Sequence, residues 1–272
     1  MTNRTLLFTF FLLLISFKSV FGQKYYEDQW KKLENNTKQG LFKSNLPVIL
    51  EIQKTAMKES NSTQLIRSLK AEFSILNTTH DDEQNDEASQ FFKKVNTLRQ
   101  SIKGDEKLLF DVLTAEFVDD YYQQNSWKIR QRTNFAETLS ESDGAVAQLE
   151  TWSKSEFKNY LSKHFAALER KKNELQKIDM GKYRKVFENS DDWDYFPTLF
   201  DWNATKEIEF LKNADFFTPN ELKVNQSKVV AIDDELIAKN SGSSQLYFQH
   251  KKIDHQCSFT NCKDKLSKLQ NL

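Results

Sequence analysis

Apolar residues recur at intervals of three and four along most of the chain, which is the spacing of amphipathic α-helices. The pattern predicts a first helix from about Tyr25 to Gln39 and a second from a cap at Ser44 to Glu59. Further helical runs centre on residues 65–76, 91–102 and 108–122, of which the last belongs to the longest apolar segment. Because the connections are short and polar, neighbouring helices are expected to pack antiparallel.

The second half begins with a small, polar stretch at 133–150, which is the best candidate for an internal hinge. Ser153 and Glu156 then have the spacing of a capping box, and they precede a helical run at 157–168. A further helix is predicted to start at Pro197, since proline is favoured in the first turn.

The last part of the sequence has a different character. Several valines and the run Leu246–Phe248 favour extended structure, with polar residues between them. Residues 216–272 are therefore expected to form a loosely ordered or partly extended tail or strand hairpin, which ends in the start of a further helix at 263–272.

The composition supports an all-α fold. The 272 residues include 6 Gly and 3 Pro, too few for the many turns of a β-sandwich or for the glycine-rich loop of a Rossmann-type nucleotide-binding protein. Aromatic residues make up 13% of the chain, which is enough apolar surface for a folded core. No strict repeat period is visible, so residues 23–215 are expected to form an irregular array of antiparallel amphipathic helices.

The N-terminus resembles an export signal. Arg4 precedes an apolar run at 6–17, and Val20 and Gly22 fit a small-residue cleavage pattern before Gln23. Residues 1–22 are therefore predicted to be a signal peptide, and no later run is apolar enough to span a membrane. The chain has 39 basic and 39 acidic side chains and no long basic block, so nucleic acid is not an expected partner.

The two cysteines, Cys257 and Cys262, lie close together in the sequence. An oxidising compartment favours a small local disulfide between them. The alternative is a zinc site formed with His250 and His255, although all four residues crowd into a shorter stretch than zinc sites of this type use. The disulfide or unpaired thiols are the favoured interpretation.

An acidic patch, Asp81-Asp82-Glu83 with Asp86-Glu87, interrupts the helical pattern. It lacks the ligand register of a calcium-binding EF-hand and is expected to be a solvated loop. His164 lies in a helical run, where a surface or boundary position is expected. No nucleophile elbow, zinc-protease motif or phosphate-binding loop occurs, so neither an enzyme nor a cofactor is predicted.

Two aromatic stretches contain the candidate interaction residues Tyr121, Tyr122, Trp127, Trp193 and Trp202. Tyrosine and tryptophan combine an apolar face with a hydrogen-bonding edge, so they could line a carbohydrate or peptide groove. Their helical spacing makes packing between helices the favoured role, and the groove remains open as an alternative.

Three runs resemble the N-terminal helical region of large exported bacterial proteins of the alpha-2-macroglobulin-like class. They are YEDQWKKLENNTKQGLFKSNLPVILEIQKTAMKESNSTQLIRSLK at 26–70, YYQQNSWKIRQRT at 121–133 and FPTLFDWNATKEIEFL at 196–211. The resemblance implies an envelope protein whose sandwich domains and bait region follow the helical part. The family's thioester motif, Cys-x-Glu-Gln, has no counterpart, since Cys257 is followed by Ser-Phe-Thr.

Together these features predict an exported, non-catalytic helical module that contacts other envelope or extracellular proteins, whether periplasmic, cell-surface or secreted. It would be a truncated or stand-alone N-terminal part of an alpha-2-macroglobulin-like protein. The alternatives are a secreted protein that binds a carbohydrate or peptide through its aromatic clusters and a zinc-dependent protein.

Overall fold

The computed structural model describes residues 23–78, 86–132, 149–187 and 196–239. The predicted signal peptide, most of the predicted hinge and the predicted tail beyond residue 239 lie outside these ranges. The chain divides into two compact units, which are described separately. Unit 1 comprises residues 1–154 and 185–187, and unit 2 comprises residues 155–184 and 188–272.

The all-α prediction is confirmed for the part of the chain that the structure describes, where the only β feature is one isolated bridge between Asp179 and Thr198. Unit 1 consists of a helix at 23–38, α2 (Asn45–Glu59), α3 (Ser62–Thr78), α4 (Asp86–Ser101) and α5 (Asp105–Arg130). Unit 2 contains all but the first residue of α6 (Lys154–Glu169), α7 (Lys172–Leu175), the 3₁₀ helix η2 (Met180–Val186) as far as Arg184, α8 (Leu199–Leu211) and α9 (Pro219–Lys239).

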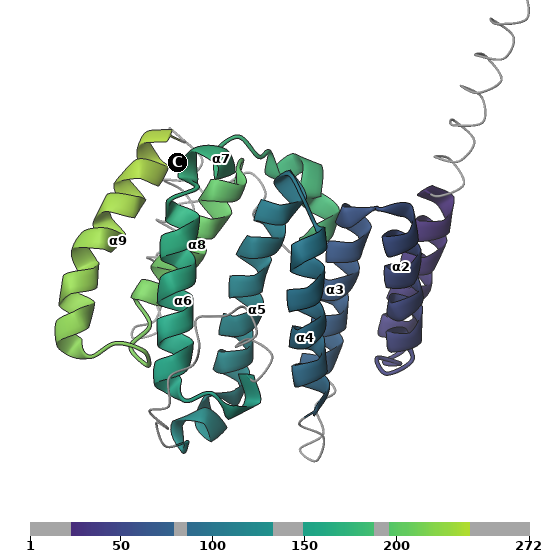
Figure 1. Cartoon of the computed structure of the whole chain (residues 1–272), viewed down its shortest axis with the longest axis horizontal. Helices are drawn as coiled ribbons and strands as arrows, with labels where there is room; N and C mark the ends of the chain where they lie inside the picture. The colour runs from purple at the N-terminus through teal and green to yellow at the C-terminus, as the bar shows by residue number, and fades with distance from the viewer. Residues whose placement is uncertain (1–22, 79–85, 133–148, 188–195, 240–272) are drawn as a thin grey trace, which may run out of the picture. The chain divides into compact units, whose positions relative to one another are not determined.

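Successive helices of unit 1 run in opposite directions, as the short connections predict (Figure 1). The longest is α5, with 26 residues, which agrees with the long apolar run in the sequence. It packs against both α3 and α4, so its residues supply much of the core of unit 1. This three-helix arrangement positions the pocket described below.

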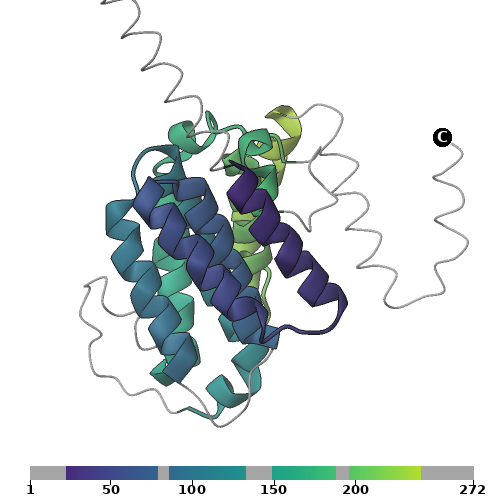
Figure 2. The same cartoon turned by 90° about the vertical axis from the view of Figure 1, so that its right-hand side faces the viewer.

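The helix at 23–38 and α2 form a hairpin (Figure 2). Gly40 has the positive φ of 73° that suits a residue just past a helix end, and the amide of Leu41 donates to the carbonyl of Asn36 at 2.9 Å. The predicted cap at Ser44 is wrong in detail, because Ser44 has helical backbone angles and its side chain caps nothing. Instead, Asn45 Nδ2 donates to Thr37 Oγ1 at 3.0 Å and so joins the two helices.

Phenylalanine rings form the centre of unit 1. Phe73 from α3 contacts Phe117 from α5 at 4.8 Å and Phe91 from α4 at 5.3 Å between ring centroids. Phe92 packs edge-on against Phe91 at 5.4 Å. All four rings are buried, and tilted or edge-to-face pairs of this kind add to the stabilisation that burial alone provides.

A buried polar cluster joins α2, α3 and α4. Gln53 Nε2 donates to Glu72 Oε2 at 2.7 Å, and the ammonium of Lys94 donates to both Glu72 and Gln53 Oε1. The Glu72 side chain is 8% exposed and that of Lys94 is 29% exposed. Since a buried carboxylate is costly without a partner, Lys94 is needed to keep Glu72 in place.

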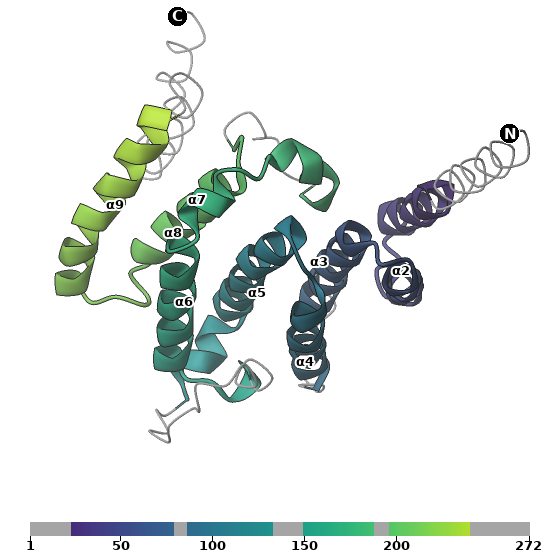
Figure 3. The same ribbon diagram turned by 45° about the horizontal axis from the view of Figure 1, so that its top comes forward.

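In unit 2, α8 begins two residues later than the sequence predicted. Thr198 is the capping residue, so Pro197 lies before the helix and not in its first turn; the amide and hydroxyl of Thr198 both donate to the Asp201 carboxylate, at 2.8 and 2.6 Å. A carboxylate at this position also interacts favourably with the positive end of the helix dipole. The helix packs beside α9 (Figure 3).

The prediction of an extended or loosely ordered chain was wrong for residues 219–239, which form helix α9. Thr218 and Glu221 make a capping box, because the amide of Thr218 donates to Glu221 Oε2 at 2.8 Å and the amide of Glu221 donates to Thr218 Oγ1 at 3.4 Å. Pro219 occupies the first helical position. The valines lower helix propensity by only a few tenths of a kcal/mol each, and the cap and packing outweigh them.

Glu221 also attaches the start of α9 to α6. Its Oε1 accepts from Lys158 Nζ at 2.6 Å, and this bond together with the bonds from Thr218 lowers the pKa of Glu221 to about 2. The folded state therefore binds fewer protons than the unfolded state between about pH 2 and pH 4.5. The contribution of Glu221 to stability is complete above this window and is lost as the pH falls through it.

We expect Glu221→Gln to lower the midpoint of thermal unfolding of unit 2 at pH 6, and we expect the difference from the unchanged protein to shrink as the pH approaches 2. Circular dichroism melting curves at pH 6, 4 and 2.5 would test this. Glu174→Gln is the matched control, since Glu174 is exposed on α7 and has no comparable bond. If the unfolding midpoints of Glu221→Gln and the unchanged protein differ by the same amount at every pH, the ionised carboxylate of Glu221 is not the source of the stabilisation.

Candidate functional site

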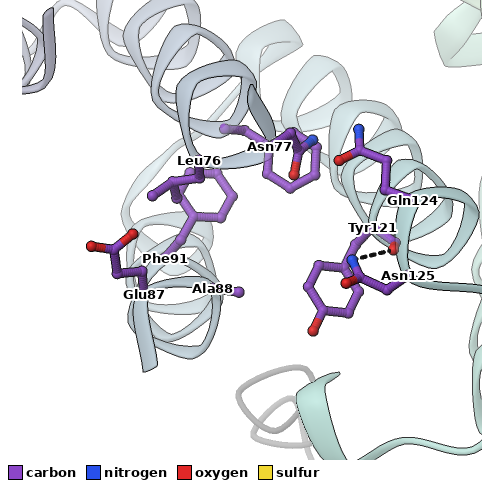
Figure 4. Close-up of a pocket in the computed structure, with 9 residues that line it drawn as sticks. Leu76, Asn77, Glu87, Ala88, Phe91, Tyr121, Gln124 and Asn125 are labelled. Carbon is purple, nitrogen blue, oxygen red and sulfur yellow. Dashed lines mark hydrogen bonds between the residues drawn. The ribbon is translucent and has the colours of Figure 1, made fainter. Parts of the chain in front are cut away.

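A pocket of about 320 Å³ opens between α3, α4 and α5 of unit 1. Its lining is largely aromatic and carboxamide, and comprises Phe73, Leu76, Asn77, Glu87, Ala88, Phe91, Tyr121, Gln124 and Asn125. Figure 4 shows Leu76 and Phe91 on one side and Tyr121 on the other, with Ala88 between them. All three helices therefore contribute to one concave site.

The apolar part of the pocket follows from the packing of the core. Phe73 and Phe91 are 5% and 1% exposed and belong to the ring cluster of unit 1, so this part of the pocket is built on a fixed surface. Ala88 lies one turn before Phe91 on α4, and its methyl group leaves room that a larger side chain would fill. The small residue is thus one reason why a cavity exists here.

The polar part is formed by side-chain amides. Asn77 lies in the last turn of α3, and Figure 4 shows its amide and that of Gln124 from α5 in the upper part of the pocket. Asn125 Nδ2 donates to the backbone carbonyl of Tyr121 at 2.9 Å, which fixes the orientation of its amide. Each carboxamide offers both a donor and an acceptor, so this edge can pair with another amide in either direction.

The hydroxyl of Tyr121 is hydrogen-bonded to the side chain of Arg132. Burial raises the pKa of Tyr121 above its ordinary value, while the hydrogen bond and charge of Arg132 act in the opposite direction. Arg132 Nη1 also donates to the carbonyl of Trp152 at 2.9 Å and approaches the carbonyl of Leu149 at 3.5 Å. The phenol is therefore neutral near pH 7 and has a defined position in the pocket wall.

A concave site of this size, with an apolar floor and a few polar groups, is typical of binding sites. None of the described residues that line it is a histidine, cysteine, serine or lysine. Within the described ranges, no three His, Cys, Asp or Glu side chains are grouped so that they could hold a metal ion. The chemistry that the pocket offers is apolar contact and amide hydrogen bonding.

The structure separates the predicted interaction residues. Tyr121 lines the pocket, whereas its neighbour Tyr122 is fully buried and packs in the core. Trp127 is 69% exposed near the end of α5. Trp202, in unit 2, lies edge-on against Phe196 at 5.2 Å, with the ammonium of Lys206 over its ring.

The remaining predicted site residues lie outside the described ranges. They are Trp193 and the four residues of the predicted disulfide or zinc site, namely His250, His255, Cys257 and Cys262. His164 is 9% exposed and stacks with Tyr160 at 5.5 Å, so it is more buried than a surface or boundary position.

The sequence analysis did not identify Asn77, Glu87, Ala88 or Gln124 as site residues. A usable signal was present, because Asn77 precedes the acidic patch and Glu87 is its last residue, while Phe73 stands four residues before Asn77 and Phe91 four residues after Glu87. That signal becomes meaningful only when α3 and α4 are known to be neighbours.

No helix in the described part of the chain combines the length and the apolar character needed to cross a bilayer. Comparison with known proteins finds no matching family model, no matching curated protein and no matching solved structure.

Proposed function

We propose that this chain is an exported, non-catalytic helical module that binds other proteins, and that the pocket between α3, α4 and α5 receives a side chain of the partner. The observation that carries the proposal is the pocket itself, with its buried aromatic floor and its carboxamide edge. Export is supported by the signal-like residues 1–22.

The carboxamides favour a peptide as the occupant. Asn77, Gln124 and Asn125 stand beside an apolar floor, so a peptide can insert one side chain and pair its backbone amide with the edge. The floor formed by Phe73 and Phe91 belongs to the core and does not need to rearrange. A preformed site of this kind binds without paying the cost of ordering itself.

The experiment is affinity capture of partners from the native envelope or extracellular extract, with the unchanged protein compared with Ala88→Leu. The added carbons of leucine occupy the space between Phe91 and Tyr121, so a partner that uses the pocket should be lost from the variant. Quantitative mass spectrometry identifies such a partner, because it is captured by the unchanged protein and not by Ala88→Leu.

Gln100→Leu is the matched control, because Gln100 is exposed on α4 and does not line the pocket. The control should capture the same partners as the unchanged protein. Circular dichroism must show that both variants keep their helix content. If every captured protein binds Ala88→Leu equally well, the pocket is not the binding site.

A second element of the proposal is that the chain corresponds to the N-terminal helical part of an alpha-2-macroglobulin-like envelope protein. The runs at 26–70, 121–133 and 196–211 and the all-α fold support it. Recovery of a protease or of a large macroglobulin-like polypeptide in the same capture would support this element. Recovery of unrelated partners alone would count against it.

Trp127 supports one other candidate, the binding of a carbohydrate. A tryptophan that is 69% exposed can stack on a sugar ring, and it lies on α5 three residues beyond Gln124 of the pocket. Titration with a glycan panel should then change the tryptophan fluorescence of the protein but not that of Trp127→Phe. Equal responses of the two proteins would exclude Trp127 as the sugar-binding residue.

A further inference from the structure

We infer that the pocket selects a cationic side chain, lysine or arginine, of its partner. The inference rests on the proposed function, since it names the kind of peptide that the pocket takes. Two observations carry it: the charge of the lining, and the aromatic rings on opposite sides of the pocket.

The lining carries one formal charge in its described part, and it is negative. Glu87 is exposed at the start of α4, beside Ala88 of the pocket wall, and the other polar residues of the lining are neutral amides and the phenol of Tyr121. The rings of Phe91 and Tyr121 stand on opposite sides. Aromatic faces attract ammonium and guanidinium groups, so rings and carboxylate favour the same ligand charge.

Among the described residues, Lys94 and Arg132 contact aromatic rings of the pocket wall, and each has other partners. Lys94 lies 5.8 Å from the centre of the Phe91 ring and is paired with Glu72. Arg132 contacts Tyr121 and donates to the carbonyls of Leu149 and Trp152. Neither is part of the described lining, so neither neutralises Glu87.

A lysine side chain suits the two parts of the pocket. Its four methylene groups can lie between Phe91 and Tyr121, and its ammonium can reach the acidic edge at Glu87. Norleucine has the same methylene chain without the charge, and glutamate reverses the charge. The order of affinity expected for these residues is therefore lysine, then norleucine, then glutamate.

The test uses three pentapeptides, acetylated and amidated at their ends, which have glycine at the outer four positions and lysine, norleucine or glutamate at the centre. Each peptide is titrated into the isotope-labelled full chain. Binding is followed by the changes in the NMR shifts of the backbone amides of α3, α4 and α5. We expect the lysine peptide to bind about 3- to 10-fold more tightly than the norleucine peptide at low salt. The preference should shrink at 0.5 M NaCl.

Two variants test where the preference arises. Glu87→Gln should lower the ratio of the affinity for the lysine peptide to that for the norleucine peptide, without weakening the binding of the norleucine peptide. Gln124→Lys should lower this ratio further, because it places a positive charge at the edge of the pocket. Asp28→Asn is the matched control, because it removes an exposed charge from the helix at 23–38, and it should leave the ratio unchanged.

The outcomes separate the inference from the proposed function. If the norleucine and lysine peptides bind equally, the pocket binds peptides without charge selection and the inference is overturned. If none of the peptides shifts the amides around the pocket, the pocket is not a peptide site and the proposed function is overturned with it. A ratio that Glu87→Gln leaves intact overturns the assignment of the preference to Glu87.

Discussion

Replacing Phe117 by alanine is expected to lower the free energy of unfolding of unit 1 by about 3–5 kcal/mol. The ring is 1% exposed and lies 4.8 Å from Phe73 and 5.5 Å from Phe91 between centroids. Its removal leaves a cavity beside rings from α3 and α4, which are held by their own helices and cannot both move inward. Both the lost burial and the empty volume therefore contribute to the loss.

Urea unfolding followed by far-UV circular dichroism measures this effect. Trp127→Ala, on the same helix, is the control, since a side chain that is 69% exposed should change the free energy of unfolding by no more than about 0.5 kcal/mol. A cost below about 1 kcal/mol for Phe117→Ala would mean that the ring cluster is not packed as described. Removing the Phe117 ring should also weaken peptide binding, because the ring supports Phe73 and Phe91, which line the pocket.

The second large effect is expected for Lys94→Met, which should cost about 2–4 kcal/mol. The variant keeps the methylene chain but leaves the carboxylate of Glu72, 8% exposed, without its cation. Gln53 still donates to Glu72, and one neutral donor does not offset the burial of a charge. The expected consequence is looser packing of α2, α3 and α4.

A double-mutant cycle with Glu72→Gln distinguishes this explanation from a loss of packing. If the unpaired charge is the cause, the double variant should recover much of the stability that Lys94→Met loses. Lys38→Met is the surface control, because Lys38 and Glu34 are 69% and 61% exposed and an exposed ion pair of this kind contributes little to stability. A double variant no more stable than Lys94→Met would point to lost packing instead.

The sequence predicted unit 1 better than it predicted unit 2, for a physical reason. The apolar stripe of α5 is long, and the short connections of α2 and α3 leave little freedom in their arrangement. In α9, by contrast, Val224 and Val230 are exposed and only Val229 is buried, so the cluster of valines that suggested a strand does not mark one buried face of the helix. The capping box of Thr218 and Glu221 was the better indicator of helix, and it was overlooked.

The pocket could not be predicted from periodicity. Periodicity identifies which residues of a helix face inward, and Tyr121 and Tyr122 satisfy it equally, yet one lines the pocket and the other is fully buried. The space beside Tyr121 depends on the small side chain of Ala88 on a neighbouring helix. A cavity of this kind depends on side-chain volumes across three helices, which only the assembled structure supplies.

The attachment of α9 has a consequence for how unit 2 opens. Its buried apolar side chains in the described part are Val229 and Leu236, while ion pairs with Lys158, Lys172 and Glu207 join it to the rest of the unit. The pairs of Lys158 with Glu221 and of Lys172 with Glu235 are part-exposed and weaken with added salt, whereas the pair of Lys228 with the buried Glu207 and the apolar contacts are screened much less. High ionic strength should thus loosen α9 at Glu221 and Glu235, so that this helix opens locally before α6 and α8 unfold.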